Sequence, residues 1–268
     1  MKIRHSFAFA ACLLMLGGAA QAQTPAYQPT VGQSGKDVVW VPTPQELVDR
    51  MLHMAQITPE DYLVDLGSGD GRTVITAAQR GTRAHGVEFN PEMVTLSKNA
   101  AQAAGVSKTA TFEQGDIFKT DFSKATVVTL FLLPDLNLRL RPTLLQMKPG
   151  TRVVSNSFTM ENWKPDETVN ASDQGCKAYC SAYKWIVPAQ VEGKWSVDGK
   201  TLALSQNFQF LEGTLTRDGN AMPISNARLN GPKIEFTVAD ARYTGTVDGD
   251  AMSGTIEGGG NWRATRAK

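Results

Sequence analysis

The stretch VDLGSGDGR, residues 64–72, decides the fold of this chain. Residues 62–66 form a short apolar run of the kind that becomes a buried strand. Residues 67–71 are then all small, and three of them are glycines, so the backbone can turn tightly and approach a bound ligand closely. The stretch therefore predicts a strand, a ligand-binding turn and the start of a helix.

Around this turn, short apolar runs alternate with helical patterns over residues 62–188, which predicts parallel strands joined by crossover helices. The further strands expected are residues 84–88, 110–114, 125–132 and 151–157, with a closing hairpin over 168–171 and 183–187. Helices are expected over residues 90–104, opened by Asn90, and over residues 136–147. The fold class is therefore α/β, a Rossmann-like, mostly parallel sheet flanked by helices.

Another helix is expected to begin just ahead of the glycine stretch. Thr43 would be its N-cap, Pro44 its first residue, and Glu46 would complete a capping box with Thr43. Ordered structure is expected from residue 38, so that the α/β domain would span residues 38–188.

The first residues have the pattern of a secretory signal peptide over residues 1–22. Basic residues precede an apolar run at residues 7–16, and Ala-Gln-Ala at 20–22 matches a cleavage site. An uncleaved anchor is the alternative, but the run is shorter than the roughly 20 residues that cross a bilayer. We therefore expect an exported, periplasmic protein with no stable membrane span after cleavage. Residues 23–37, rich in Gly, Pro, Gln and Ser, are expected to be a flexible lead-in.

The charge balance excludes some classes of partner. The chain has 27 Lys and Arg residues against 26 Asp and Glu residues, with no basic run or stripe. A surface that follows a phosphate backbone or an anionic membrane is expected to be basic. We therefore predict a protein or small-molecule partner and no nucleic acid.

Cys176 and Cys180 remain after signal cleavage, and an exported chain enters a compartment in which nearby thiols oxidise. Their spacing permits a disulfide only if the chain bends between them, because four residues of straight strand hold the two sulfurs too far apart. Two unpaired thiols in a loop are the alternative. No metal site is expected, since no second pair of ligands accompanies them.

After residue 188 the helical patterns vanish and turn signals recur, as at Asp198-Gly199, Asp218-Gly219 and Asn230-Gly231. The segments between them have the length of antiparallel strands. Residues 189–268 are therefore expected to form a small all-β antiparallel module, a filled barrel or a sandwich.

Polar groups follow three neighbouring strands of the predicted sheet. Asp65 and the glycine turn end the first strand, Glu88 ends the second, and Asp116 follows the third. Such strand ends meet in one crevice, where Glu88 can accept two ribose hydroxyls and Asp116 an adenine amino group. The glycine spacing, with Arg72 in the last place, departs from the NAD fingerprint. A nucleoside cofactor other than NAD is expected here.

The motifs VDLGSGDGR, HGVEFNPEMV and FEQGDIF together resemble the class I methyltransferases that use S-adenosylmethionine, over residues 40–159. Within that class, VPTPQELVDRMLHMA and TLFLLPDLNLRLRP resemble the lysine methyltransferases related to the seven-strand histone enzyme and the ATP synthase c-subunit enzymes.

The resemblance implies S-adenosyl-L-methionine as cofactor and assigns its contacts. Asp65 and the turn would bind its methionine end, Glu88 its ribose, and Asp116 with Ile117 its adenine, while residues 41–43 would either cap the methionine side or simply start the helix. The complete set of expected cofactor residues is Asp65, Gly67, Ser68, Gly69, Asp70, Gly71, Glu88, Asn90, Asp116 and Ile117.

The methyl acceptor implied is a protein lysine or another amine. Asp135 and Asn137 follow the fourth strand, where such enzymes face the substrate, although Asp135 equally suits an N-cap. No catalytic residue is assigned, because in-line methyl transfer requires alignment rather than a triad. Two alternatives stay open: an exported protein that binds S-adenosylmethionine or a nucleoside without catalysis, and a β module that is itself the functional binding part.

Overall fold

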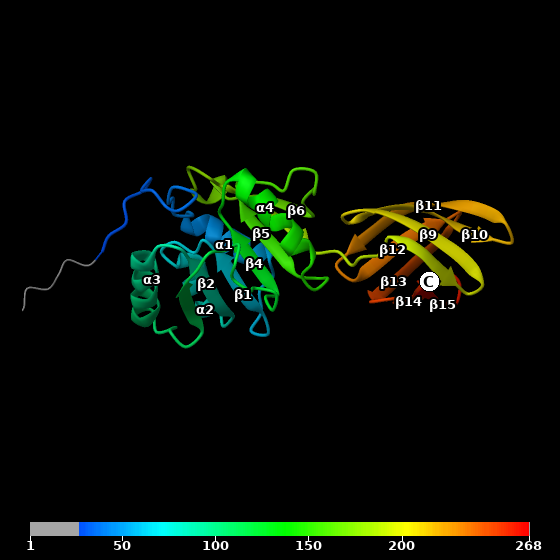
Figure 1. The fold of residues 1–268 in the computed structure, drawn as a ribbon, viewed down its shortest axis with the longest axis horizontal. Coiled ribbons are helices and arrows are strands. Elements are labelled where there is room, and N and C mark those ends of the chain that lie inside the picture. The colour runs from blue at the N-terminus through cyan, green and yellow to red at the C-terminus, as the bar shows by residue number, and fades with distance from the viewer. Residues whose placement is uncertain (1–26, 268) are drawn as a thin grey trace, which may run out of the picture.

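The computed structural model describes residues 27–267 of the 268-residue chain. The expected signal peptide at residues 1–22 and the first residues of the expected lead-in, 23–26, lie outside this range. Figure 1 shows two units side by side along the long axis, an α/β unit followed by a β barrel that contains the C-terminus. None of the helices in residues 27–267 has the length and apolar character needed to cross a membrane.

A seven-stranded sheet in the order β3-β2-β1-β4-β5-β7-β6 forms the centre of the α/β unit. Its strands are β1 Tyr62–Leu66, β2 Arg83–Glu88, β3 Ala110–Gln114, β4 Val127–Leu130, β5 Arg152–Asn156, β6 Glu167–Asn170 and β7 Ser181–Ile186. β1 to β5 are parallel, whereas β7 is antiparallel to both of its neighbours. The predicted mostly parallel sheet is thus confirmed. Because β4 lies on the opposite side of β1 from β2, the strand order reverses at β1, which is where open α/β sheets bind ligands.

Four helices cover the two faces of this sheet: α1 Gln45–Met54, α2 Arg72–Gln79, α3 Pro91–Ala103 and α4 Pro134–Leu145. Successive residues of β1 point to opposite faces, so Leu63 packs in the core shared with α1, α2 and α3, while Val64 packs in the core shared with α4. The predicted start of α3 is confirmed, because the Asn90 side chain accepts a hydrogen bond from the Glu92 amide at 2.8 Å. The sheet is therefore held rigidly between two apolar layers.

Two predicted helix caps are wrong. Thr43 makes no capping bond to α1, because its hydroxyl accepts a hydrogen bond from Asn156 Nδ2 at 3.2 Å and Pro44 occupies the N-cap position. Asp135 does not cap α4, since Leu133 is the N-cap residue and Asp135 lies exposed in the first turn. Both side chains are placed by their surroundings rather than by the local helix-start pattern.

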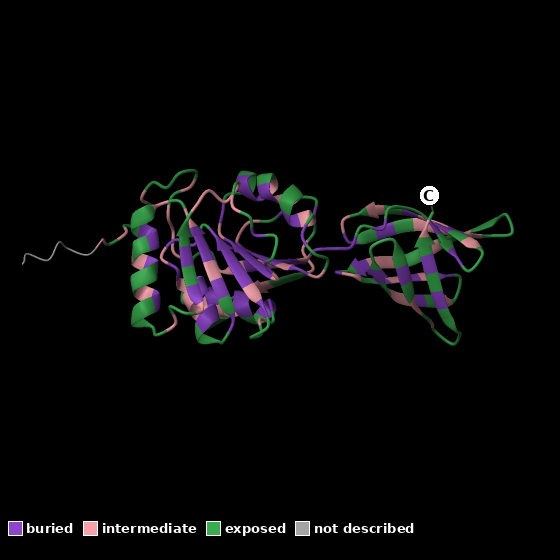
Figure 2. Ribbon diagram, turned by 60° about the horizontal axis from the view of Figure 1, so that its bottom comes forward, coloured by how far each residue is buried: buried purple, intermediate pink, exposed green. Residues whose placement is uncertain are grey.

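The expected β module is a closed barrel of antiparallel strands in the order β10-β11-β12-β13-β14-β15-β8-β9. The strands are β8 Gly193–Val197, β9 Lys200–Asn207, β10 Phe210–Arg217, β11 Asn220–Asn230, β12 Lys233–Val238, β13 Ala241–Asp248, β14 Ala251–Ile256 and β15 Asn261–Arg266. Figure 2 shows buried and exposed residues alternating along them. Large side chains fill the interior, including Trp195, Phe236 and Trp262, each no more than 1% exposed. The filled barrel was one of the two forms expected.

The barrel is docked on the α/β unit and not merely tethered to it. The expected boundary at residues 188–189 falls between the end of β7 and the start of β8. Phe208, at the turn between β9 and β10, stacks on Trp163 with ring centroids 5.9 Å apart. Arg228 of β11 donates to Asp166 Oδ1 at 2.5 Å. Two barrel segments thus contact the loop that precedes β6.

Candidate functional site

A cavity of about 520 Å³ opens at the carboxyl ends of β1 to β4, within the size range of small-molecule sites. Residues 33–43 form one wall of this cavity. The segment was expected to be a flexible lead-in up to residue 37, but its backbone forms a β-bridge between Ser34 and Val39, and Trp40 donates its amide to Gln33 O at 2.9 Å. The lead-in is therefore part of the site from Gln33 onward.

The turn after β1 has the backbone that only glycine adopts easily. Gly67, Gly69 and Gly71 have φ values of 81°, 53° and 81°. A Cβ atom on Gly69 would lie 2.7 Å from Trp40 Nε1, and one on Gly71 would lie 2.8 Å from the Phe112 ring. Gly67 and Gly69 line the cavity, whereas Gly71 lies beneath it against Phe112 and is not part of its surface. The turn thus presents bare backbone to a ligand.

Glu88 is fixed at the end of β2 by two backbone amides. Its Oε2 accepts from the Gly69 amide and its Oε1 from the Asn90 amide, both at 2.9 Å. These bonds hold the carboxylate plane in one orientation beside the glycine turn. The remaining lone pairs of both oxygens are available to a pair of neighbouring hydroxyl groups.

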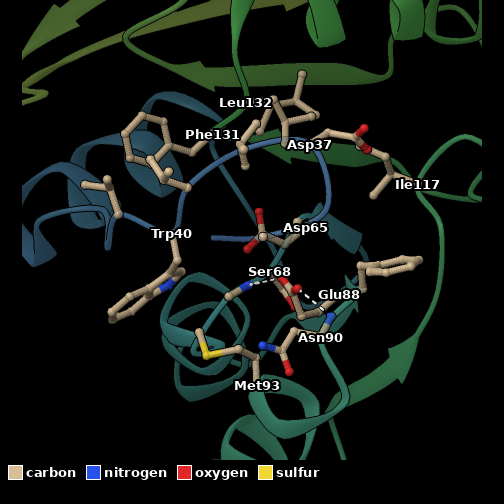
Figure 3. Close-up of a pocket in the computed structure, with 18 of the residues that line it drawn as sticks. Asp37, Trp40, Asp65, Ser68, Glu88, Asn90, Met93, Ile117, Phe131 and Leu132 are labelled. Atoms are coloured by element: carbon tan, nitrogen blue, oxygen red, sulfur yellow. Dashed lines mark hydrogen bonds between the residues drawn. The ribbon is translucent and has the colours of Figure 1, made fainter. Parts of the chain in front are cut away.

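Asp65 is the most perturbed acid of the cavity. Its side chain is 7% exposed, and Figure 3 shows it between Glu88 and Met93 on one side and Phe131 and Leu132 on the other. Burial, together with the nearby charges of Asp70 and Glu88, raises the pKa of this carboxyl to about 7, although the hydroxyl of Thr129 donates to it at 2.6 Å and opposes the rise. A cationic group in the cavity would stabilise the carboxylate and remove this cost.

Asp116 is bound to the lead-in segment. Lys36 Nζ lies 2.8 Å from Asp116 Oδ2 and also lies over the Phe89 ring, 5.1 Å from its centroid. The hydrogen bond from Lys36 lowers the pKa of Asp116, and the same bond raises the pKa of Lys36. Sequence reasoning missed Lys36, because no periodicity marks the segment that carries it.

Other expected cofactor residues have additional roles. Asp70 accepts hydrogen bonds from the Arg72 guanidinium. The same guanidinium donates to Thr43 O at 2.8 Å and so connects the turn to the lead-in. Ser68 is buried with its hydroxyl facing Gly86, where a Cβ atom would lie 2.5 Å from its Oγ. Among the expected cofactor residues, the structure brings the following to the cavity surface: Asp65, Gly67, Ser68, Gly69, Asp70, Glu88, Asn90, Asp116 and Ile117.

Asp135 and Asn137, expected on the acceptor side, do not line the cavity. Asn137 is fully buried, and its Nδ2 lies 3.3 Å from both Ser155 Oγ and Phe158 O. It therefore supports the loop after β5 and faces no substrate. The prediction for Asn137 is wrong because α4 begins earlier than expected and turns Asn137 into the core, whereas the prediction for Asp135, which lies exposed in the first turn of α4, stays a prediction.

Aromatic side chains to which the sequence analysis gave no role line the acceptor side of the cavity instead. Phe131 directly follows β4, Phe158 follows β5, and Tyr179 precedes β7. Tyr179 lies in a loop closed by a disulfide between Cys176 and Cys180, whose Cα atoms are 5.7 Å apart. The bend that the disulfide requires lies between the two cysteines, at Ala178 and Tyr179. The only sequence signal for Phe131, Phe158 and Tyr179 was their position, directly after a strand or between the two cysteines.

A comparison with protein families identifies the same region. The model of the ANTKMT methyltransferase domain matches residues 65–167. The protein-lysine N-methyltransferase of Saccharolobus islandicus (strain REY15A) is 43% identical over 139 residues, which are 51% of this chain and 86% of that protein. The ATP synthase c-subunit lysine N-methyltransferase of Mus musculus is 36% identical over 141 residues, but the match spans only 57% of that protein.

Among solved structures, an RNA methyltransferase from Salinibacter ruber in complex with S-adenosyl-L-homocysteine is 47% identical, with a TM-score of 0.53. The match covers 56% of this chain and 96% of that one. These matches cover the α/β unit, which holds the glycine turn, Glu88 and Asp116. They include a relative that is matched over most of its length. The chain therefore belongs to the class I S-adenosylmethionine-dependent lysine methyltransferases.

Proposed function

We propose that this protein transfers a methyl group from S-adenosylmethionine to the Nζ atom of a lysine side chain on an acceptor protein. The observation that carries the proposal is the cavity itself, in which a buried Asp65, a glycine turn and a fixed Glu88 line one side and aromatic rings line the other. When bound, the cofactor supplies an electrophilic methyl carbon on a sulfonium. The lysine ammonium group first loses a proton to water, the freed electron pair of the nitrogen forms the new bond to that carbon, and the electron pair of the C–S bond returns to sulfur.

The residues of the chain bind and orient the cofactor in this proposal. Glu88, held by two amides, accepts both ribose hydroxyls. Asp65 offers a carboxylate to the ammonium group, and the bare backbone at Gly67 and Gly69 allows close approach. Asp116 accepts the adenine amino group once Lys36 has left it. An exposed ion pair of this kind is weak, so its exchange costs little.

The charge of the cavity favours a lysine acceptor over RNA, the acceptor in the name of the Salinibacter ruber relative. Two cationic side chains line the cavity, Lys36 and Arg72. The carboxylates that line it are Asp37, Asp65, Asp70, Glu88 and Asp116. An acidic cavity attracts an ammonium group and repels a phosphate backbone.

Transfer of a tritiated methyl group tests the proposal. S-adenosylmethionine labelled in the methyl group is incubated with the protein and, in separate arms, with poly-L-lysine, poly-L-arginine or RNA. We expect label in methyllysine after hydrolysis of the poly-L-lysine arm only. Label in RNA alone, or in no arm, would contradict the lysine acceptor, and calorimetric binding without any transfer would indicate a binding protein that lacks catalysis.

Glu88→Ala and Glu92→Ala form a matched pair for the cofactor site. Glu92 lies exposed on α3, whereas Glu88 lines the cavity. Loss of two charge-assisted hydrogen bonds is expected to weaken cofactor binding by about 100-fold in the Glu88 variant and to leave it unchanged in the Glu92 variant. Equal affinity in the two variants would contradict the ribose assignment.

We propose further that the protein is exported to the periplasm. The signal pattern of residues 1–22 and the disulfide between Cys176 and Cys180 both support this compartment. Fusion of residues 1–22 to alkaline phosphatase, which folds only after export, tests it. An inactive fusion, compared with an active one that carries a known signal, would contradict export.

A further inference from the structure

We propose that Tyr179, held at the cavity mouth by the disulfide between Cys176 and Cys180, binds the acceptor lysine, so that methyl transfer depends on the redox state of this disulfide. The proposal rests on the proposed function and names a residue that determines how the acceptor is held.

Tyr179 belongs to a continuous aromatic wall. Its ring meets Phe131 edge-on with centroids 5.3 Å apart, and Phe131 stacks with Phe158 at 6.3 Å. All three rings line the cavity. Phe131 and Phe158 follow β4 and β5, which lie across β1 from β2, which ends at Glu88, and from β3, which precedes Asp116. The wall therefore faces the side of the cavity that the proposed cofactor contacts leave free.

The wall also reaches solvent, as an acceptor site must. Tyr179 and Leu133 are each 46% exposed although both line the cavity. Apolar surface that lines the cavity and is also open to solvent, the rim of the wall, is available to an incoming side chain. A lysine side chain matches it, because its four-carbon stem can cover the rim while its ammonium group lies against aromatic faces and near the acidic interior.

The disulfide is the constraint that keeps Tyr179 in place. The residue has φ of 55°, a left-handed conformation that a side chain of this size adopts only when its surroundings impose it. Within the described chain, residues 177–179 make no backbone–backbone hydrogen bond. The two ends are anchored instead, since Cys176 is buried in the core beside α1 and Cys180 O accepts from the Ala171 amide at 2.9 Å. Reduction would open the ring that the disulfide closes around residues 177–179, and the two anchors would then hold only the ends of the segment.

Phe158 forms the other end of the aromatic wall, and its position is set by the strained residue Ser157, which precedes it. Ser157 has φ of 60°, and the Phe158 amide donates to Asn156 O at 2.7 Å, forming a γ-turn. Ser157 is also bonded through its amide to Ser181 O at 2.8 Å. This end of the wall does not depend on the disulfide, so reduction is expected to remove Tyr179 from the wall and leave Phe158.

The experiment measures methyl transfer to poly-L-lysine and binding of S-adenosylmethionine for the full chain, oxidised or treated with dithiothreitol. Tyr179→Leu removes the ring. Tyr179→Phe retains the ring, and phenylalanine must adopt the same left-handed backbone conformation. A double variant, Cys176→Ser with Cys180→Ser, cannot form the disulfide. We expect kcat/KM to fall about tenfold in the Leu variant, in the double Ser variant and in the reduced wild type, and to stay within about twofold in the Phe variant. Cofactor affinity is expected to be unchanged throughout.

Combining the changes separates binding from a general loss of structure. If Tyr179 carries the redox effect, dithiothreitol has no further effect on the Leu variant, because the ring is already absent. Wild-type transfer that is insensitive to reductant, an equal further loss in the reduced Leu variant, or a parallel loss of cofactor affinity would overturn this proposal alone. Absence of transfer by the oxidised wild type would contradict the proposed function, and this proposal with it.

Discussion

The carboxyl group of Asp65 has a pKa of about 7 because it is buried near two other acids, and this value makes cofactor binding depend on pH. Below that pH the group is neutral in the free protein, and it must lose its proton to pair with a cationic ligand. We expect the affinity for S-adenosylmethionine to fall by roughly tenfold or more from about pH 7.5 to about pH 5.5. Calorimetry in buffers of different ionisation enthalpy measures both the affinity and the proton released. Asp65→Asn should bind more weakly than the wild type at about pH 7.5, show a flat profile and approach the wild-type affinity at low pH, and a flat profile in the wild type would contradict the assignment.

The same pKa has the opposite consequence for the stability of the ligand-free protein. The folded-state pKa of about 7 lies above the ordinary value of 3.8, so the folded state binds this proton more tightly than the unfolded state. The contribution of Asp65 to the free energy of unfolding is therefore greatest at low pH and declines as pH rises from about 4 to about 7. Asp65→Asn should gain roughly 2–3 kcal/mol relative to the wild type between about pH 5 and about pH 8. Urea unfolding at the two pH values checks this, and a difference that is independent of pH would refute it.

At the scale of elements, the turn between β1 and α2 is where a single methyl group should matter most. Gly71 and Gly105 both have positive φ, but a Cβ on Gly71 would lie 2.8 Å from Phe112 and from Ser97, whereas one on Gly105 would meet nothing within 4 Å. Gly105→Ala should cost only about 1 kcal/mol of stability for its backbone conformation. Gly71→Ala should cost more than about 2 kcal/mol and weaken cofactor binding at least about tenfold, because the turn must shift. Thermal unfolding and calorimetry compare the two, and equal losses would show that the packing under the turn is unimportant.

The elements that could be predicted are those specified by local pattern. β3 has the expected bounds, and α3 begins after Asn90, because an apolar strand run and an Asn-Pro helix start require no distant partner. The cap predicted at Thr43 failed because the hydroxyl is taken by Asn156, far along the chain. The meeting of Asp65, Glu88 and Asp116 could also be predicted, because each lies at or just after the carboxyl end of a strand and such ends share one edge of a parallel sheet. Lys36 and Tyr179 could not be placed in this way, since tertiary contacts and a disulfide hold them.

At the scale of the whole molecule, the barrel is expected to share its stability with the α/β unit through a small junction. Arg228 pairs with Asp166, which also accepts from the Ile186 amide at 2.8 Å at the end of the sheet. The stack of Phe208 on Trp163 adds an apolar contact, so the junction is expected to couple the two units by about 1–2 kcal/mol. A ligand that binds only the folded α/β unit should then also protect the barrel.

Hydrogen exchange near the unfolding midpoint, with and without S-adenosylmethionine, measures this coupling. In the wild type the cofactor should slow exchange in α/β strands such as β1 and also in barrel strands such as β13. Opening the barrel breaks the junction, and the free energy of this opening is expected to be larger when the cofactor is bound. Phe208→Ala combined with Arg228→Ala should confine the protection to the α/β unit. Arg242→Ala, which removes an exposed pair with Glu235 on the barrel itself, is the matched control and should leave the coupling intact. Protection of the α/β unit alone in the wild type would mean that the barrel is an independent unit, whose docking does not respond to the cofactor site.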